Sequence, residues 1–88
     1  MNSSDRIPCC VPFCGRTLSR KRFPWAHEVI CGPHYRGASK ILRLRHARLR
    51  RKLNRLTTLD KAYGRLVDLD WRLWERIKRQ AIERAAGV

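Results

Sequence analysis

Two close pairs of metal-binding side chains lie in the first part of this chain. Cys9 and Cys14 form the first pair, Cys31 and His34 form the second, and 16 residues separate them. Two close pairs joined by a longer loop are a common way to bring four ligands to one tetrahedral Zn²⁺ ion. We therefore expect one structural zinc ion, bound by three thiolates and one imidazole, that fixes the path of the chain between these residues.

Two further residues could enter this ligand set. Cys10 could replace Cys9, because its spacing to Cys14 is also workable, and the residues alone leave this choice open. His27 could replace His34, but its neighbours suggest a hairpin position, and a lone histidine is more often exposed or hydrogen-bonded than metal-bound. Disulfide bonds are a weaker explanation of the four cysteines, because nothing in the sequence signals secretion.

The composition describes a small and strongly basic protein. Its 88 residues suffice for one domain, and 21 Lys and Arg against 7 Asp and Glu give a formal net charge of +14. Such an excess favours polyanionic partners, namely nucleic acid, an anionic membrane or acidic proteins. A hydrophobic content of 43 % argues against a wholly disordered tail. No apolar signal segment or stretch of transmembrane length is visible, so we expect a cytoplasmic protein with reduced thiols.

The residues around the two pairs carry a longer pattern. Residues 9–16 read CCVPFCGR, and residues 31–36 read CGPHYR. This combination resembles small phage and bacterial zinc-finger proteins, in which C-x4-C, often ending C-G-R, precedes C-x2-H-Y-x-R. The resemblance implies Cys9 as the first ligand and a regulatory or accessory role for a phage or mobile element, in a bacterial cell or an infected host. Phe13 departs from this pattern, because a small residue, often Gly, is usual there, and it could strain or reshape the turn.

The order of the expected elements is similar to a treble-clef zinc finger. Residues 12–15 predict a knuckle, a tight turn whose backbone N–H groups point at thiolate sulfur, with Gly15 relieving the backbone. Residues 16–30 predict a short, irregular hairpin with a basic tip at residues 20–22. Residues 31–34 then open a helix, since Pro33 is tolerated in a first helical turn.

The rest of the chain predicts two amphipathic helices. Residues 35–56 contain no Pro and no acidic residue, and their apolar seam repeats every seven residues. A break follows at residues 57–60, where Thr57 or Thr58 could cap a second helix over residues 59–86. The two seams comprise Leu42, His46, Leu49, Leu53 and Leu56 in the first helix, and Leu59, Ala62, Tyr63, Leu66, Leu69, Leu73, Ile77 and Ala81 in the second.

These elements define the expected architecture. We predict a small α-rich zinc-binding fold in which a treble-clef-like finger, residues 1–36, precedes an antiparallel two-helix hairpin, residues 37–88. The finger and the hairpin are expected to form a single compact unit, since a short turn between amphipathic helices favours antiparallel packing.

Positive charge is concentrated before the second helix. Residues 1–58 carry 14 Lys and Arg against two acids, or +12, whereas residues 59–88 carry 7 against 5, or +2. We therefore expect a nucleic-acid-binding protein, with DNA more likely than RNA and no membrane role. The predicted contacts are Arg16, Arg20, Lys21, Arg22, Arg36, Lys40, Arg43, Arg48, Arg50, Arg51 and Arg55.

Two alternatives to this function follow from the same residues. The chain could be a protein-interaction module that inhibits or recruits a larger protein, with Trp71 and Trp74 as the partner interface or a homodimer contact. The first expectation for these two aromatic residues is nevertheless that they fill the core of the helical hairpin. Catalysis is less expected, because three Cys and one His close a tetrahedral site and only His27 and Glu28 nearby could act as acid or base. We therefore predict that the chain is not an enzyme.

Overall fold

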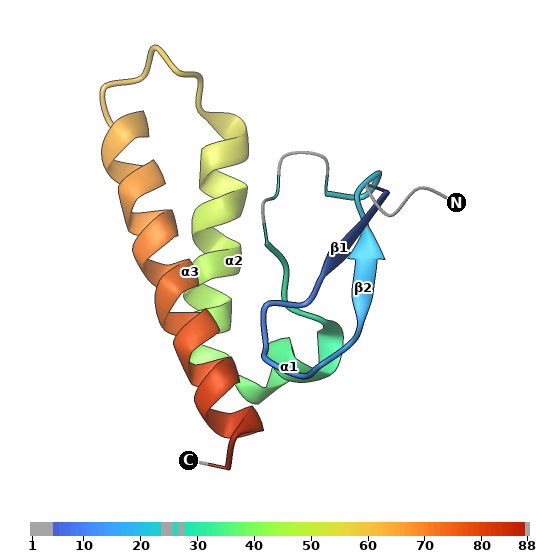
Figure 1. Ribbon diagram of the computed structural model, residues 1–88. Helices are drawn as coiled ribbons and strands as arrows, with labels where there is room; N and C mark the ends of the chain where they lie inside the picture. Colours follow the sequence, from blue (N-terminus) through green and yellow to red (C-terminus); the bar gives the residue numbers. More distant parts are fainter. Residues whose placement is uncertain (1–4, 24–25, 27, 88) are drawn as a thin grey trace.

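Helices dominate the fold, with one small sheet before them. The computed structural model describes residues 5–23, 26 and 28–87. The elements, in chain order, are β1 (Arg6–Pro8), β2 (Thr17–Ser19), α1 (Gly32–Gly37), α2 (Lys40–Arg55) and α3 (Tyr63–Ala85). Figure 1 shows α2 and α3 side by side and running in opposite directions, as the sequence predicts. No helix in this described part of the chain is long and apolar enough to cross a membrane.

The two strands form a hairpin whose loop contains the first ligand pair. β1 and β2 are antiparallel, with Ile7 opposite Leu18 in the register. The hairpin expected within residues 16–30 was therefore misplaced, because β2 pairs with the strand before the knuckle. The basic tip instead follows β2 as a turn in which the Arg22 N–H donates to the Ser19 carbonyl. Strands of three residues are too short to show the alternation that identifies a strand in a sequence.

A break separates the second ligand pair from the basic helix. Cys31 is the N-cap of α1 and Pro33 lies in its first turn, so residues 31–34 open a helix as predicted. That helix ends at Gly37, and α2 begins again with Ser39 as its N-cap, whose side chain accepts a hydrogen bond from the Leu42 N–H. The expectation of one helix from residue 35 to residue 56 was wrong, since the backbone is extended at Ala38.

The predicted apolar seams pack against each other between α2 and α3, except for some seam residues near the loop that connects the two helices. Leu42 and Leu49 of α2 are buried, as are Leu73, Ile77 and Ala81 of α3. The remaining described seam positions that pack against this core are only partly buried, namely Leu53 and Leu66.

The second helix starts later than expected. Leu59 is 92 % exposed and Leu69 is 44 % exposed, so their assignment to the seam was wrong. Thr57 does not cap α3; its N–H instead donates to the Asp60 carboxylate in the connecting loop. Leu69 lies outside the seam because a helix turns by about 100° per residue, which puts it on the flank of the stripe marked by Leu73 and Ile77.

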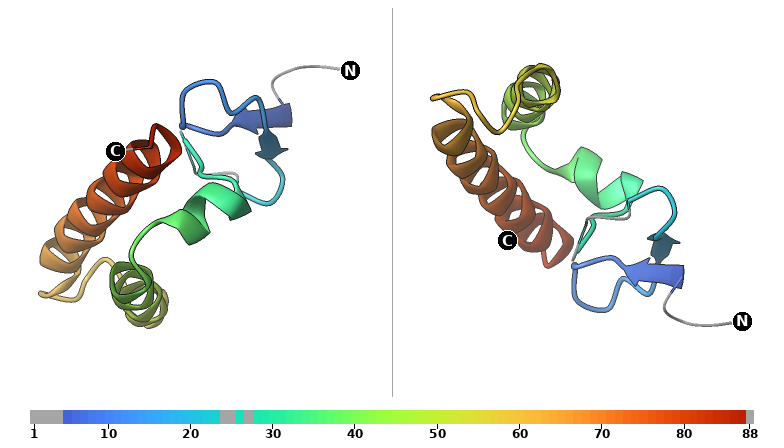
Figure 2. Two further views of the ribbon diagram at one scale, coloured as in Figure 1. Left: turned by 90° about the horizontal axis from the view of Figure 1, so that it is seen from below. Right: turned by 90° about the horizontal axis from the view of Figure 1, so that it is seen from above.

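The finger shares its core with the helices. Cys9, Val11, Ile30 and Cys31 belong to the same buried cluster as the residues of α2 and α3. Figure 2 shows α1 between the strands and the α2–α3 pair. The linker after α1 is also bonded to α3, since the Ser39 N–H donates to Gln80 Oε1 at 2.8 Å and Arg84 donates to the Gly37 carbonyl.

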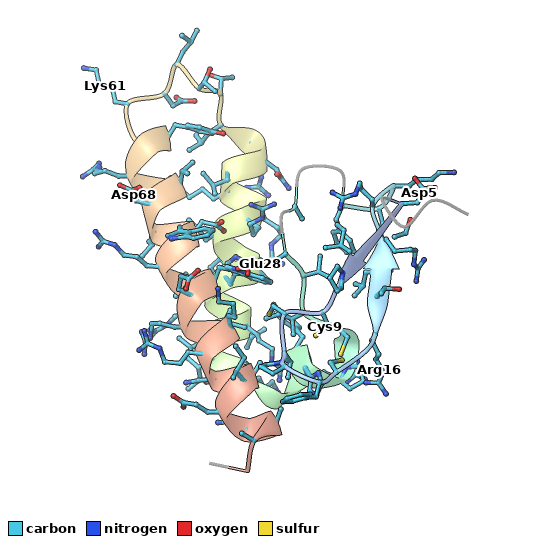
Figure 3. The ribbon with its side chains drawn as sticks, viewed as in Figure 1. Asp5, Cys9, Arg16, Glu28, Lys61 and Asp68 are labelled. Carbon is cyan, nitrogen blue, oxygen red and sulfur yellow. The ribbon has the colours of Figure 1, made fainter. Side chains whose placement is uncertain are left out.

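A polar contact that the sequence did not reveal holds residues 28–30 against α3. Trp74 Nε1 donates to Glu28 Oε1 at 2.8 Å, and Lys78 Nζ lies 3.0 Å from the same oxygen. Burial alone would raise the pKa of Glu28, but the hydrogen bonds from Trp74 and Lys78 outweigh it and lower that pKa. Figure 3 shows Glu28 between the finger and the helices.

We expect Leu73→Ala to destabilise the protein far more than Leu69→Ala. The two leucines lie one turn apart on α3, but Leu73 is 8 % exposed and Leu69 is 44 % exposed. Truncating the buried leucine should cost about 2–5 kcal/mol of unfolding free energy, and truncating the exposed one less than about 1 kcal/mol. Urea denaturation of both variants measures the difference, and equal costs would contradict the packing described above.

The Glu28 contact predicts a component of acid sensitivity. Because folding lowers the Glu28 pKa, the unfolded chain binds more protons in acid. This stabilisation is present above the unfolded value of about 4.5 and is lost as pH falls through the lower folded pKa. We expect Glu28→Gln, which retains an acceptor for Trp74, to show a shallower loss of unfolding free energy below that pH. Metal ligands also take up protons in acid, so both proteins must be compared in the same buffer; superimposable curves would exclude this role for Glu28.

Candidate metal centre

The four predicted ligands converge on one point. Cys9 follows β1, Cys14 lies in the hairpin loop, Cys31 caps α1 and His34 lies in its first turn. One ligand atom from each of these side chains lies within 4.8 Å of the others, close enough to hold one metal ion. This convergence confirms the predicted grouping of residues separated by up to 25 positions in the sequence.

The spacing of the ligand atoms fits a tetrahedral ion of the size of zinc. Bonds of about 2.3 Å to sulfur and about 2.0 Å to nitrogen put two sulfurs about 3.8 Å apart, and a sulfur and a nitrogen about 3.5 Å apart, at a tetrahedral ion. Cys14 Sγ lies 3.7 Å from Cys31 Sγ. His34 Nδ1 lies 3.8 Å from Cys9 Sγ and 3.2 Å from Cys31 Sγ. Three sulfurs and one imidazole are also a donor set that Zn²⁺ accepts in structural sites.

Cys9, not Cys10, belongs to this group. Cys10 is half-buried beside the cluster, and among the described residues it is not one of the converging ligands. Burial, the neighbouring Cys9 and the Glu28 carboxylate raise the pKa of Cys10 to about 11, so its thiol stays protonated. The other alternative ligand, His27, lies outside the described residues.

Donors around the cluster favour thiolate at Cys31. Burial raises the pKa of Cys31, but hydrogen bonds from the His34 backbone, from Arg16 and from the other thiols outweigh it and lower the pKa to about 6. Arg16 Nη1 lies 3.7 Å from Cys31 Sγ, and the Cys31 N–H donates to Cys9 Sγ at 3.3 Å. A deprotonated thiol is the form that binds metal.

The knuckle reaches this geometry through two left-handed residues. Gly15 has a φ of 75°, which glycine adopts freely and which matches its predicted role. Phe13 has a φ of 65°, an uncommon conformation for a bulky residue, and its side chain is fully exposed. The sequence predicts that Phe13 either strains or reshapes the turn. The turn is kept, closed by the Cys14 N–H donating to the Val11 carbonyl, and Phe13 takes the left-handed conformation within it.

The two tryptophans of the expected interface lie in different environments. Trp74 is half-buried, its Nε1 is bonded to Glu28 and its ring lies 6.2 Å from that of His46. Trp71 is 59 % exposed. Trp74 therefore contributes to packing, and a partner role at Trp71 stays a prediction.

His46 lies at the boundary between α2 and α3, where the sequence places it. Its Nε2 lies 2.9 Å from Asp70 Oδ1, although that oxygen has no hydrogen bond of good geometry. Burial and the nearby Arg50 lower the pKa of His46, against the opposing effect of Asp70. The imidazole is therefore mainly neutral at pH 7, and the short distance is a polar contact rather than an ion pair.

The expected basic contacts divide into two groups. Four of them have side-chain partners within the protein: Arg16 at Cys31, Arg22 at the Phe23 ring, Arg43 at the Ala38 carbonyl and the Tyr35 ring, and Arg50 at Asp70. Arg20 also has an interaction within the protein. The second group is exposed and consists of Lys21, Arg36, Lys40, Arg48, Arg51 and Arg55.

We expect Cys31→Ser to abolish stoichiometric metal binding and Cys10→Ser to preserve it. Cys31 is a member of the converging group and Cys10 is its neighbour outside that group. Elemental analysis should give about one ion per chain for the Cys10 variant, and visible absorption after Co²⁺ substitution should report tetrahedral thiolate ligation. Loss of the ion in both variants, or in neither, would contradict this assignment.

Comparisons with known proteins do not place the chain in a family. No family model matches the sequence, no curated protein matches it, and no solved structure matches the fold. Function must therefore be inferred from the residues of this chain.

Proposed function

We propose that this protein is a zinc-stabilised, nucleic-acid-binding protein that contacts phosphates through the outward face of α2. The observation that carries this proposal is a row of exposed cations on the side of α2 opposite its buried leucines, interrupted only by the exposed Leu44 between Lys40 and Arg48. We call this row the α2 basic face; it comprises Lys40, Arg48, Arg51 and Arg55, with Arg45 and Lys52 beside them.

The α2 basic face has no acidic residue to neutralise it. α2 contains no Asp or Glu, and the α3 carboxylate that reaches it, Asp70, lies against His46 and Arg50 on the inner side. Among the described residues, none of the six cations of this face forms an ion pair. Exposed faces of stable helices usually mix charges, so this asymmetry favours a polyanionic partner.

The exposed side of α3 provides a comparison within the same molecule. It carries Arg72, Arg76 and Arg79, but Asp68 and Glu83 lie among them. A face of mixed charge attracts polyanions less strongly than a face of one sign. We therefore assign polyanion binding to α2 and a supporting role in the fold to α3. Arginine suits phosphate contacts because its planar guanidinium donates two parallel hydrogen bonds.

The metal centre supports this function without taking part in chemistry. Four protein ligands would complete a tetrahedral zinc site and leave no position for a reactive water, so we propose a structural ion and no enzymatic activity. A treble-clef-like finger would then hold α1, and through it the start of α2. A cytoplasmic regulatory or accessory role for a phage or mobile element rests on the resemblance of residues 9–16 and 31–36 alone.

A specific observation also favours a second candidate, a protein-interaction module. Ile41 and Leu44 are 63 % and 56 % exposed, and both lie among the cations of the first half of the α2 basic face. Apolar side chains next to cations would suit an acidic protein surface that normally binds nucleic acid. DNA remains the first candidate, because the two apolar residues occupy only the first half of α2 and cations continue to its end.

We expect the triple variant Arg48→Ala, Arg51→Ala and Arg55→Ala to lose duplex DNA affinity and salt dependence. Each lost phosphate contact should reduce the steepness of the log affinity against log salt plot by about 0.9. The matched control replaces Arg72, Arg76 and Arg79 of α3 with Ala, which removes the same charge. Fluorescence anisotropy across a salt series measures both.

The outcomes separate the two candidates. Equal losses in the two triple variants would exclude the α2 basic face as the contact. Absence of nucleic-acid binding at low salt would overturn the first candidate, and recovery of one protein from nuclease-treated lysate, dependent on Ile41 and Leu44, would support the second.

A further inference from the structure

A cleft separates the finger from the α2–α3 pair. Its volume is about 860 Å³, which falls within the about 300–1,000 Å³ typical of ligand sites. Leu18, Phe23 and Tyr35 line it from the finger and α1, and Trp71 and Trp74 line it from α3. The cleft is distinct from both the metal centre and the α2 basic face.

The cleft offers aromatic surface in contact with solvent. Trp71 is 59 % exposed, although it lies on the same helix as the buried residues Leu73 and Ile77. On the finger side, the Arg22 guanidinium lies 5.5 Å from the centre of the Phe23 ring. Aromatic rings and guanidinium planes are the surfaces on which unstacked nucleobases stack. Trp74 completes the wall and is held by its bond to Glu28.

The charged side chains that line the cleft balance, with Arg22, Arg50 and Lys78 against three carboxylates. Its carboxylates Glu28 and Glu75 both contact Lys78, at 3.0 Å and 3.3 Å. The third carboxylate, Asp70, is paired with Arg50. Arg22 forms no ion pair among the described residues.

The cleft also borders α2, the helix that carries the proposed phosphate-binding surface. Arg50 lines the cleft with a side chain that is 43 % exposed, and Arg51 of the α2 basic face lies about 100° further around the same helix. A strand that leaves the cleft beside Arg50 and passes around α2 would meet further cations.

We propose that this cleft binds a single-stranded segment of nucleic acid, with one base stacked on Trp71 and the flanking phosphates at Arg22 and Arg50. The inference rests on the proposed function, because it names the form of nucleic acid that the protein accepts in addition to a duplex. Stacking on Trp71 requires an unpaired base, whose two faces are accessible, whereas phosphates on the α2 basic face can belong to paired or unpaired strands. The interaction is tolerant of sequence, since every base has a π-face.

The test measures binding of an oligo(dT) strand and of a mixed-sequence duplex to the same variants of the full chain. Trp71→Ala should weaken oligo(dT) binding by about 5- to 150-fold and leave duplex affinity unchanged. Trp71→Phe should retain most of the single-strand affinity, because an aromatic face remains. Leu69→Ala, another exposed apolar position on α3, is the matched control and should change neither. Arg22→Ala should weaken oligo(dT) binding and reduce its salt dependence.

Each result decides between the two proposals. Duplex binding through the α2 basic face together with oligo(dT) affinity insensitive to Trp71→Ala would overturn the cleft inference alone. Failure of both ligands to bind at low salt would overturn the proposed function as well. A protein recovered from nuclease-treated lysate and lost with Trp71→Ala, without any change in oligo(dT) affinity, would assign the cleft to a protein segment. Circular dichroism of the Trp71 variants, whose altered side chain is exposed, establishes that they remain folded.

Discussion

The convergence of Cys9, Cys14, Cys31 and His34 is the constraint on which the rest of this fold depends. The hairpin has two strands of three residues each, and α1 has six residues, so neither element would be stable alone. The segments before α2 supply half of the ten residues of the shared buried cluster, and two of those, Cys9 and Cys31, are metal ligands. A chain of 88 residues with a formal charge of +14 also repels itself. An ion bound by four ligands would offset these costs at the point where the hairpin loop meets α1.

Residue type and spacing made the metal ligands predictable, because three thiols and one imidazole in two close pairs match the donor set and the spacing of structural zinc sites. The antiparallel helices were predictable for a similar reason, since Leu42 and Leu49 repeat with the helical period over a long segment. Single residues that end or start a helix were harder to recognise inside such a long segment. Gly37 and Ser39 mark the end of one helix and the start of the next, but both signals were missed because residues 35–56 contain no Pro and no acidic residue to interrupt the pattern.

The contacts that could not be predicted are those between segments far apart in the chain. β1 shows no alternation in three residues, so only the observed pairing with β2 reveals it. Glu28 and Trp74 are 46 positions apart, and no periodicity links a loop carboxylate to an indole on α3. Phe13 is different, because its departure from the glycine usual in such turns was visible in the sequence. Its fully exposed ring and its φ of 65° give the fold no packing in return for the strain.

Acidic residues are few, and their placement explains how one helix can be both structural and basic. Asp70 meets Arg50 on the inner side of α2, and Glu28 meets Lys78 on α3, so these two acids join elements of the fold. None of the described acids neutralises the outward side, where Arg48 lies one turn from both Arg51 and Lys52. Like charges at these spacings destabilise a helix by about 0.2–0.5 kcal/mol per pair. Packing of Leu42 and Leu49 against α3 must offset that repulsion in the free protein. A bound polyanion would remove the repulsion, so the stability of α2 and the affinity for the ligand are thermodynamically linked.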